Sequence, residues 1–136
     1  MTVCGIEMSG SEARLVILEG KKTSFKHIDI EPRKIKLIND EIPDEVKEFR
    51  NAIFTFLKKN KISLVTIKKR GKKGDYSGGP VGFKLEGIVQ LYEECQVILT
   101  SPQTISAAQK KYSPAKPENL RKYQYTAFET AFSVLT

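Results

Sequence analysis

The chain has 136 residues, the size of one domain, and 40% of them are hydrophobic, as in an ordinary globular protein. Its 23 lysines and arginines outnumber 16 aspartates and glutamates, for a net charge of +7. This balance argues against an acidic partner and favours a polyanion such as nucleic acid, although lysines that merely solubilise a surface would produce the same count. No apolar run approaches the length of a membrane span and no signal-peptide pattern opens the sequence, so we expect a cytoplasmic protein without a membrane partner.

The first part of the chain predicts three short strands at residues 3–8, 13–18 and 25–30. Glycines, serines and lysines between them are typical of tight turns, which join antiparallel neighbours. We therefore expect an antiparallel meander. Residues 31–43, with a proline at each end of the segment, are expected to be irregular.

The rest of the chain alternates helices and strands. Helical spacing of apolar residues predicts helices at 44–60, 82–94, 102–110 and 118–135, and apolar runs predict strands at 62–67 and 97–99. A meander followed by alternating elements predicts an α/β fold in one domain, residues 1–136. Its mixed sheet has five strands, the meander plus two parallel strands, and helices on both faces.

Two cysteines, Cys4 and Cys95, and one histidine, His27, exclude two kinds of site. These three residues are too few for a tetrahedral structural zinc ion. His27 lies within a predicted strand with no serine motif near it, so a hydrolase triad is excluded too. We interpret both cysteines as buried thiols.

The most informative segment follows the predicted strand 62–67. Five cations fall within residues 68–74, namely Lys68, Lys69, Arg70, Lys72 and Lys73. Burying an unpaired charge is costly, so the segment must face water or an anionic partner. Ligands of open α/β sheets bind beyond the carboxyl ends of the strands. We therefore predict a nucleic-acid-binding surface here, to which Lys84 and Lys122 also belong.

The order of elements resembles the ribonuclease H-like fold, in the variety seen in Holliday-junction resolvases. Gly5-Ile6-Glu7 looks like the first strand of that family, where an acidic residue follows Gly-Ile, and residues 127–132 look like its alanine-spaced last helix. The whole chain is similar to a small bacterial family of unknown function, on residues 5–7, 67–70, 83–87 and 123–124. This second resemblance implies a fold and carries no known activity.

The resemblance to resolvases implies cleavage of phosphodiesters with two metal ions held by several carboxylates. Glu7 occupies the first acidic position, but Lys68 or Lys69 stands where the next acid is expected. Residues 122–125 contain none of the acids expected near the last helix. One carboxylate among lysines is a poor magnesium site. We therefore expect a nucleic-acid-binding domain with a degraded metal site and no established cofactor.

Two other functions stay open. A divergent nuclease would hold Mg²⁺ or Mn²⁺ with Glu7 and either Glu86 or Glu48, which makes Glu7 and Glu86 the candidate catalytic residues. Glu7 would otherwise form an ion pair with Lys68, and Glu86 would serve the helix dipole or a salt bridge. A protein-interaction or nucleotide-binding domain on the same fold is the third function. The sequence leaves DNA, RNA and a homodimer open.

Overall fold

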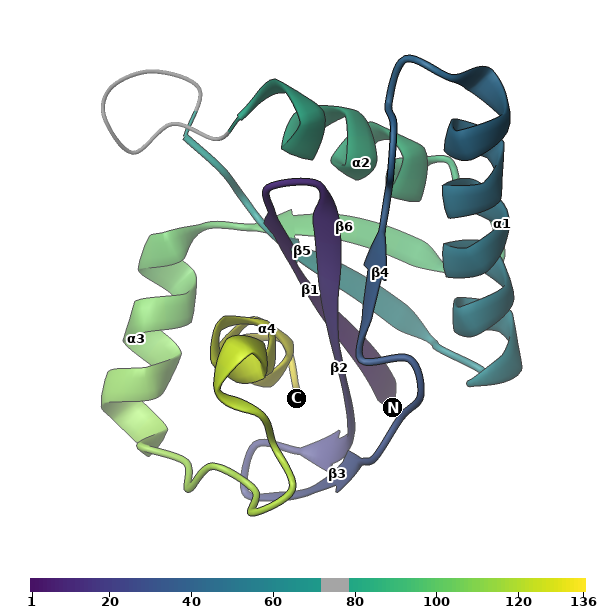
Figure 1. Ribbon diagram of the computed structural model, residues 1–136. Helices are drawn as coiled ribbons and strands as arrows, with labels where there is room; N and C mark the ends of the chain where they lie inside the picture. Colours follow the sequence, from purple (N-terminus) through teal and green to yellow (C-terminus); the bar gives the residue numbers. More distant parts are fainter. Residues whose placement is uncertain (72–78) are drawn as a thin grey trace.

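The computed structural model describes residues 1–71 and 79–136, and its strands form one mixed sheet (Figure 1). The strands are β1 (Thr2–Ser9), β2 (Glu12–Lys21), β3 (Ser24–Ile28), β4 (Lys34–Lys36), β5 (Leu64–Lys68) and β6 (Gln96–Thr100). The order across the sheet is β3-β2-β1-β5-β6, and β4 pairs with β2. The pairs of β1 with β2 and of β2 with β3 are antiparallel, whereas β5 runs parallel to both β1 and β6. The predicted meander and parallel pair are therefore confirmed.

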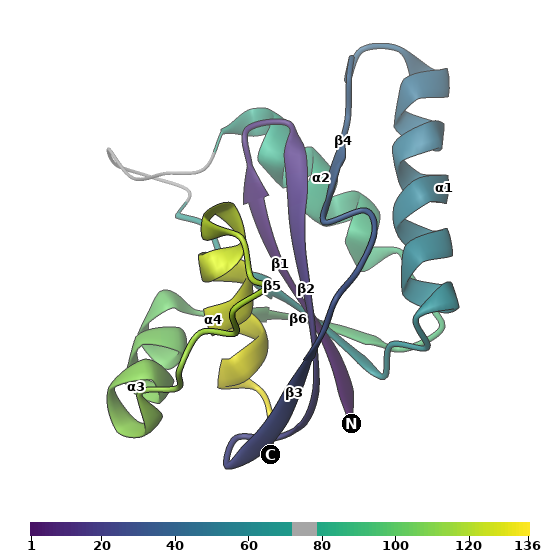
Figure 2. The ribbon, with the colours of Figure 1, turned by 60° about the horizontal axis from the view of Figure 1, so that its bottom comes forward.

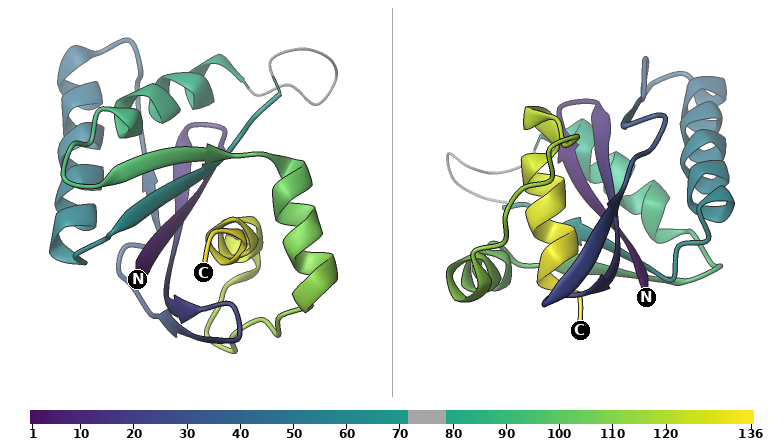
Figure 3. Two further views of the ribbon diagram at one scale, coloured as in Figure 1. Left: turned by 180° about the vertical axis from the view of Figure 1, so that it is seen from behind. Right: turned by 90° about the horizontal axis from the view of Figure 1, so that it is seen from below.

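Helices cover both faces of the sheet, as expected. They are α1 (Pro43–Lys59), α2 (Pro80–Gln90), α3 (Pro102–Tyr112) and α4 (Tyr125–Ser133), and a turn of 3-10 helix, η1 (Lys122–Gln124), leads into α4. The right-hand view of Figure 3 shows α1 and α2 on one side of the sheet and α3 and α4 on the other. In Figure 2, α4 lies between α3 and the sheet, in agreement with its contacts to both.

Alternating residues of β1 divide the core into two clusters. Cys4, Ile6 and Met8 pack with the apolar faces of α1 and α2, and Val3 packs with α4. Gly5 shares the face of Val3, because side chains two residues apart in a strand point the same way. A Cβ atom on Gly5 would lie 2.3 Å from the carbonyl oxygen of Ala127 in α4. The glycine therefore lets α4 press directly onto β1.

The sheet has six strands rather than five, because residues 31–43 are not wholly irregular. Within them β4 pairs antiparallel with β2, with Ile35 opposite Ala13. Ile35 is buried, while the lysines on either side of it are exposed. Three residues carry too short an alternation to predict a strand from sequence.

The end of the chain also differs from the prediction, since α4 begins at Tyr125 and not at residue 118. The residues before it form an irregular segment with a turn at 118–119, and this segment leads into η1. Gln124, only 1% exposed, makes the connection. Its carboxamide oxygen accepts a hydrogen bond from the Arg121 amide, and its carboxamide nitrogen donates one to the Leu15 carbonyl. In the same way α2 ends at Gln90, short of the predicted residue 94.

Candidate nucleic-acid interface

A row of charged side chains crosses the sheet where β1 and β5 end and α4 begins. Lys34 of β4 lies opposite Arg14 of β2, and Arg14 lies opposite Glu7 of β1. On the other side of β1, Ile6 lies beside Ile67 of β5, so the next two residues along these parallel strands are Glu7 and Lys68. Residues that face one another across strands share a side of the sheet. These four residues, Lys34, Arg14, Glu7 and Lys68, form what we call the cross-strand row, on the face covered by α4.

Glu7 forms an ion pair within the row with Arg14, whereas the sequence analysis named Lys68 as the partner in the ion-pair alternative. The Arg14 guanidinium Nη1 lies 3.6 Å from Glu7 Oε1, and Arg14 Nε donates a 2.8 Å hydrogen bond to Glu12 Oε2. The hydrogen bond to Glu12, with the negative charges of Glu12 and Glu7, raises the pKa of Arg14 above its already high value. Arg14 is thus a permanent cation between two carboxylates.

An aromatic ring from the start of the last helix lies against the basic end of the row. The ring of Tyr123, in η1, has Lys34 Nζ 5.0 Å and the Arg14 guanidinium carbon 5.9 Å from its centroid, within the range of cation–π contacts. Lys122, which the sequence predicted as a nucleic-acid ligand, is the exposed residue just before Tyr123. The ring and Lys122 extend the basic surface from the sheet to η1.

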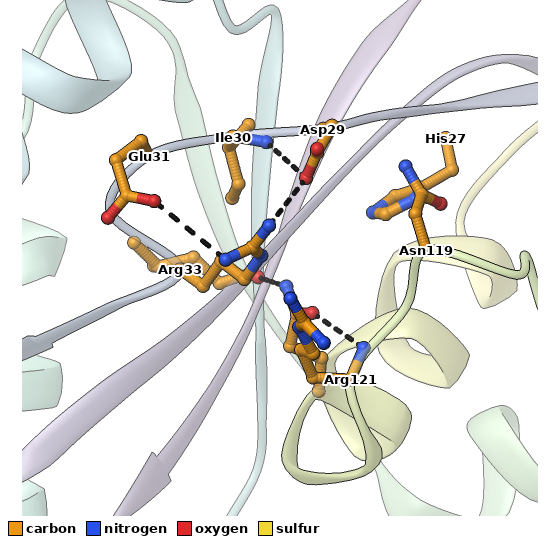
Figure 4. A network of polar contacts seen from close by, with 9 residues as sticks. His27, Asp29, Ile30, Glu31, Arg33, Asn119 and Arg121 are labelled. Atoms are coloured by element: carbon orange, nitrogen blue, oxygen red, sulfur yellow. Dashed lines mark hydrogen bonds and ion pairs between the residues drawn. The ribbon is translucent and has the colours of Figure 1, made fainter.

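Polar contacts hold η1 and the β3–β4 connection against β2 (Figure 4). The guanidinium of Arg33 lies 3.2 Å from an Asp29 carboxylate oxygen and 3.8 Å from one of Glu31. The Leu15 amide donates a 2.9 Å hydrogen bond to the Arg33 carbonyl, and the Leu15 carbonyl accepts the hydrogen bond from Gln124. Both backbone groups of Leu15 are therefore hydrogen-bonded, although Leu15 lies in the gap between the strand partners β3 and β4.

The basic segment begins inside β5, because Lys68 is the last residue of that strand. Lys68 is half-buried and Lys69 is exposed, and the Lys69 amide donates a hydrogen bond to the Thr100 carbonyl of β6. The sheet therefore fixes the backbone of both lysines, and Lys68 lies beside Glu7. Lys72 and Lys73 lie outside the described residues.

Arg70, one of the five cations expected to bind nucleic acid, makes contacts within the protein itself. Its guanidinium donates a 3.2 Å hydrogen bond to the Met8 carbonyl and lies over the Phe83 ring of α2, 5.6 Å from the centroid. Gly82 makes room for it, since a Cβ there would lie 1.7 Å from Arg70 Nη1. Arg70 therefore joins the ends of β1 and β5 to α2 instead of extending into water.

Three other predicted residues lie on the two helices of the opposite face. Lys84 of α2 binds the Asp40 carbonyl and lies 3.5 Å from its carboxylate. Glu86, on the same helix, is buried at 8% exposure, and Glu48 is exposed on α1. Because α1 and α2 pack against the far side of the sheet, neither carboxylate joins Glu7 on the α4 face.

These placements do not fit the metal ions that the resemblance to resolvases implies. Within residues 1–71 and 79–136, no three His, Cys, Asp or Glu residues lie close enough together to hold a metal ion. Glu7 and Glu12 are both occupied by Arg14, and the neighbouring strand contributes the cation Lys68. Two positive side chains at this point oppose a divalent cation by direct repulsion.

Two hollows among the described residues lie beside α1, away from the row. A hollow of about 460 Å³ lies between α1 and the segment after α2, lined by residues that include Phe54, Leu91 and Glu94. A smaller hollow, of about 90 Å³, lies between β4 and α1. Neither is lined by a residue of the cross-strand row.

Sequence reasoning missed Arg14, Glu12 and Lys34. The first two could have been found, because a two-residue turn at Gly10 and Ser11 sets the register of the hairpin and places Glu7 opposite Arg14. Gly10 has φ +57°, the conformation that such a turn requires. Lys34 had no such signal, since it depends on the three-residue strand β4.

Comparison with other proteins gives one family and a set of similar structures. The model of the family described as "Protein of unknown function (DUF3010)" matches residues 1–134. No curated protein matches the sequence. None of the helices in the described part of the chain is long and apolar enough to cross a membrane.

Similar solved structures include Holliday-junction resolvases. RuvC from Thermus thermophilus superposes with a TM-score of 0.74 at 15% identity, covering 98% of this chain and 92% of that one. The T. thermophilus RuvC in complex with Holliday junction substrate gives 0.69 at 13% identity, with the same coverage. The fowlpox virus resolvase in complex with its substrate Holliday junction DNA gives 0.53 at 17% identity, covering 98% and 91%. At these identities the likeness establishes the ribonuclease H-like fold, and the chain itself belongs to the DUF3010 family of proteins of unknown function.

Proposed function

We propose that this protein binds nucleic acid at the edge of the sheet where β5 ends. The observation that carries the proposal is the position of Lys68, a member of the cross-strand row and the last residue of β5, and of Lys69 directly after it, at the carboxyl ends of two parallel strands. Phosphate groups supply the negative charge that such a surface lacks. Two proteins of the same fold hold Holliday junction DNA, which makes DNA the first ligand to test.

The contacts divide the predicted ligands into two groups. Lys68 lies on the α4 face, Lys122 lies in η1 just before α4, and Lys69 is exposed directly after β5, where Lys72 and Lys73 continue the basic segment. Arg70 and Lys84 are engaged by backbone or carboxylate oxygens of the protein itself. We therefore assign the phosphate contacts of the segment to its four lysines and not to all five of its cations. A cytoplasmic location, as predicted from the sequence, suits such a ligand.

The nuclease alternative has less support from the placement of its residues. It requires Glu86 or Glu48 beside Glu7, and both belong to helices packed on the far face. The charge of Arg14 and Lys68 beside Glu7 favours binding of a phosphate over coordination of a metal ion.

The salt dependence of DNA binding tests the proposal. Fluorescence anisotropy with a labelled four-way junction, a duplex and a single strand measures affinity over a series of salt concentrations. Four phosphate contacts predict that log affinity falls with log salt at a slope of about −3.6 on duplex DNA. A slope near zero, or no binding at low salt, contradicts the proposal.

A charge-matched pair of variants locates the surface. Replacing Lys68, Lys69, Lys72 and Lys73 by alanine removes most binding in this proposal. The control replaces four exposed lysines elsewhere, Lys21, Lys26, Lys47 and Lys59, and changes net charge equally. Equal loss in both variants would mean that binding follows overall charge rather than this surface.

A further inference from the structure

We infer that Arg14 takes the place of a metal ion beside Glu7, and that the cross-strand row binds the phosphate backbone directly through Lys34 and Lys68. This inference rests on the proposed function and extends its surface across the sheet to β4. It also states that binding needs no divalent cation.

Charge within the row supports this assignment. Lys34, Arg14 and Lys68 contribute three positive charges on one face, and Glu7 and Glu12, both beside Arg14, contribute two negative charges. Arg14 is shared between Glu7 at 3.6 Å and Glu12 at 2.8 Å, so its charge is already used within the protein. The cations left for a ligand are the lysines at the two ends of the row, with the Glu7–Arg14 pair between them.

The dimensions of the row suit a nucleic-acid strand. Lys34 and Lys68 lie on β4 and β5, three strand spacings apart, which is about 14 Å at roughly 4.8 Å per spacing. Phosphates recur along one nucleic-acid strand at intervals shorter than this distance, so the two lysines can reach different phosphates of the same strand. Lys34 is exposed, and its ammonium group is held 5.0 Å from the centre of the Tyr123 ring. The row can thus contact two phosphates of one strand without deforming the sheet.

Replacing Glu7 should change the affinity for DNA in opposite directions in this arrangement and in a metal site. In a metal site Glu7 is a ligand, and its loss weakens binding that depends on the metal. In the cross-strand row Glu7 repels phosphate and holds Arg14 away from it. Glu7→Gln should therefore strengthen binding, by about threefold for one unit charge roughly 6 Å from a phosphate in water.

The experiment measures binding of the labelled junction by wild type, Glu7→Gln and Glu93→Gln, in EDTA and in Mg²⁺ at matched ionic strength. Glu93 is an exposed carboxylate just before the first residue of β6. The last residue of that strand, Thr100, lies beside Lys68, so Glu93 is far from the row and controls for net charge alone. We expect Glu7→Gln to bind about threefold more tightly than Glu93→Gln, and Mg²⁺ to give no gain in affinity. Weaker binding by Glu7→Gln, or a gain with Mg²⁺ that this variant loses, overturns the inference.

A second pair of variants tests the far end of the row. With Lys34 as a fifth contact the wild-type slope becomes about −4.5, so Lys34→Ala should return it to about −3.6, while Lys47→Ala on α1 leaves it unchanged. An unchanged slope in Lys34→Ala removes β4 from the interface. The two proposals fail separately: wild type that binds no DNA ends the proposed function, whereas binding that is indifferent to Glu7 and Lys34 ends only this inference.

Discussion

The carboxamide of Gln124 donates a 2.9 Å hydrogen bond to the carbonyl oxygen of Leu15, a residue 109 positions earlier in the chain. Both groups are buried, and the Leu15 carbonyl faces the gap between β3 and β4, where β2 has no strand partner. This contact fixes the turn that carries Tyr123 and Lys122. The position of the candidate interface therefore depends on one buried side chain outside it.

Gln124→Ala should destabilise the fold, whereas replacement of an exposed glutamine should have no effect on stability. The change removes the partner of the buried Leu15 carbonyl and of the Arg121 amide, which costs about 1–3 kcal/mol in unfolding free energy. Thermal unfolding followed by circular dichroism should show a lower Tm, by several degrees for a chain of this size. Gln103→Ala, on the exposed face of α3, is the control. Equal Tm values for the two variants would show that the buried contact contributes nothing.

Two glycines should respond to alanine in opposite directions. At Gly5 the added Cβ meets backbone and Cβ atoms of α4 at 2.3 Å and 2.6 Å, so the helix must move away from β1. We expect Gly5→Ala to lower the unfolding free energy by about 1–3 kcal/mol or more. Gly87 lies exposed within α2 with nothing within 4 Å, so Gly87→Ala should raise it by about 0.5–1 kcal/mol. Urea denaturation measures both, and a stable Gly5→Ala would mean that α4 is not packed as closely as described.

The parts of the fold that sequence could predict are those with strong local patterns. The hairpins, the parallel strands and α1 follow from alternation, turns and helical spacing. The start of α3 was also predicted correctly, with Ser101 as the N-cap and Pro102 as the first helical residue. The element β4 and the late start of α4 could not be predicted, because they depend on tertiary contacts to β2. Leu120 continues a helical pattern, yet it is buried after a turn in an irregular segment, and the Gln124 hydrogen bonds fix the residues that follow it.

The candidate site was predicted only in part, for a related reason. The basic segment is a sequence feature, and Glu7 was found through a resemblance. Which charge pairs with Glu7 is decided by register, and antiparallel pairing brings Arg14 directly opposite it. Arg70 could not be separated from its neighbours, since its role depends on the space beside Gly82.

The buried thiol of Cys4 should make stability fall at alkaline pH. Burial is the main cause that raises the pKa of Cys4 far above its ordinary value of 9.0, and the nearby Cys95 thiol adds to it. The unfolded chain ionises this thiol from about pH 9 while the folded protein keeps it neutral. Stability is therefore complete below pH 9 and decreases above it, by up to about 1.4 kcal/mol per pH unit. Cys4→Ala should show a smaller decrease between pH 9 and pH 10 in urea denaturation, and an identical pH dependence would contradict this origin.

Tyr123 is the residue through which the fold and the interface are most directly connected. Its ring lies against Lys34 and Arg14, and cation–π contacts at such partly exposed sites are worth about 0.5–1 kcal/mol each. Removing the ring in Tyr123→Ala frees the Lys34 side chain, so we expect DNA binding to weaken by about two- to fivefold with little change in Tm. Tyr123→Phe keeps the ring and should bind as wild type does. If the phenylalanine variant is as weak as the alanine variant, the hydroxyl group and not the ring contributes to binding. If neither variant changes affinity, Tyr123 does not position Lys34 for a phosphate, and the basic surface ends at β5.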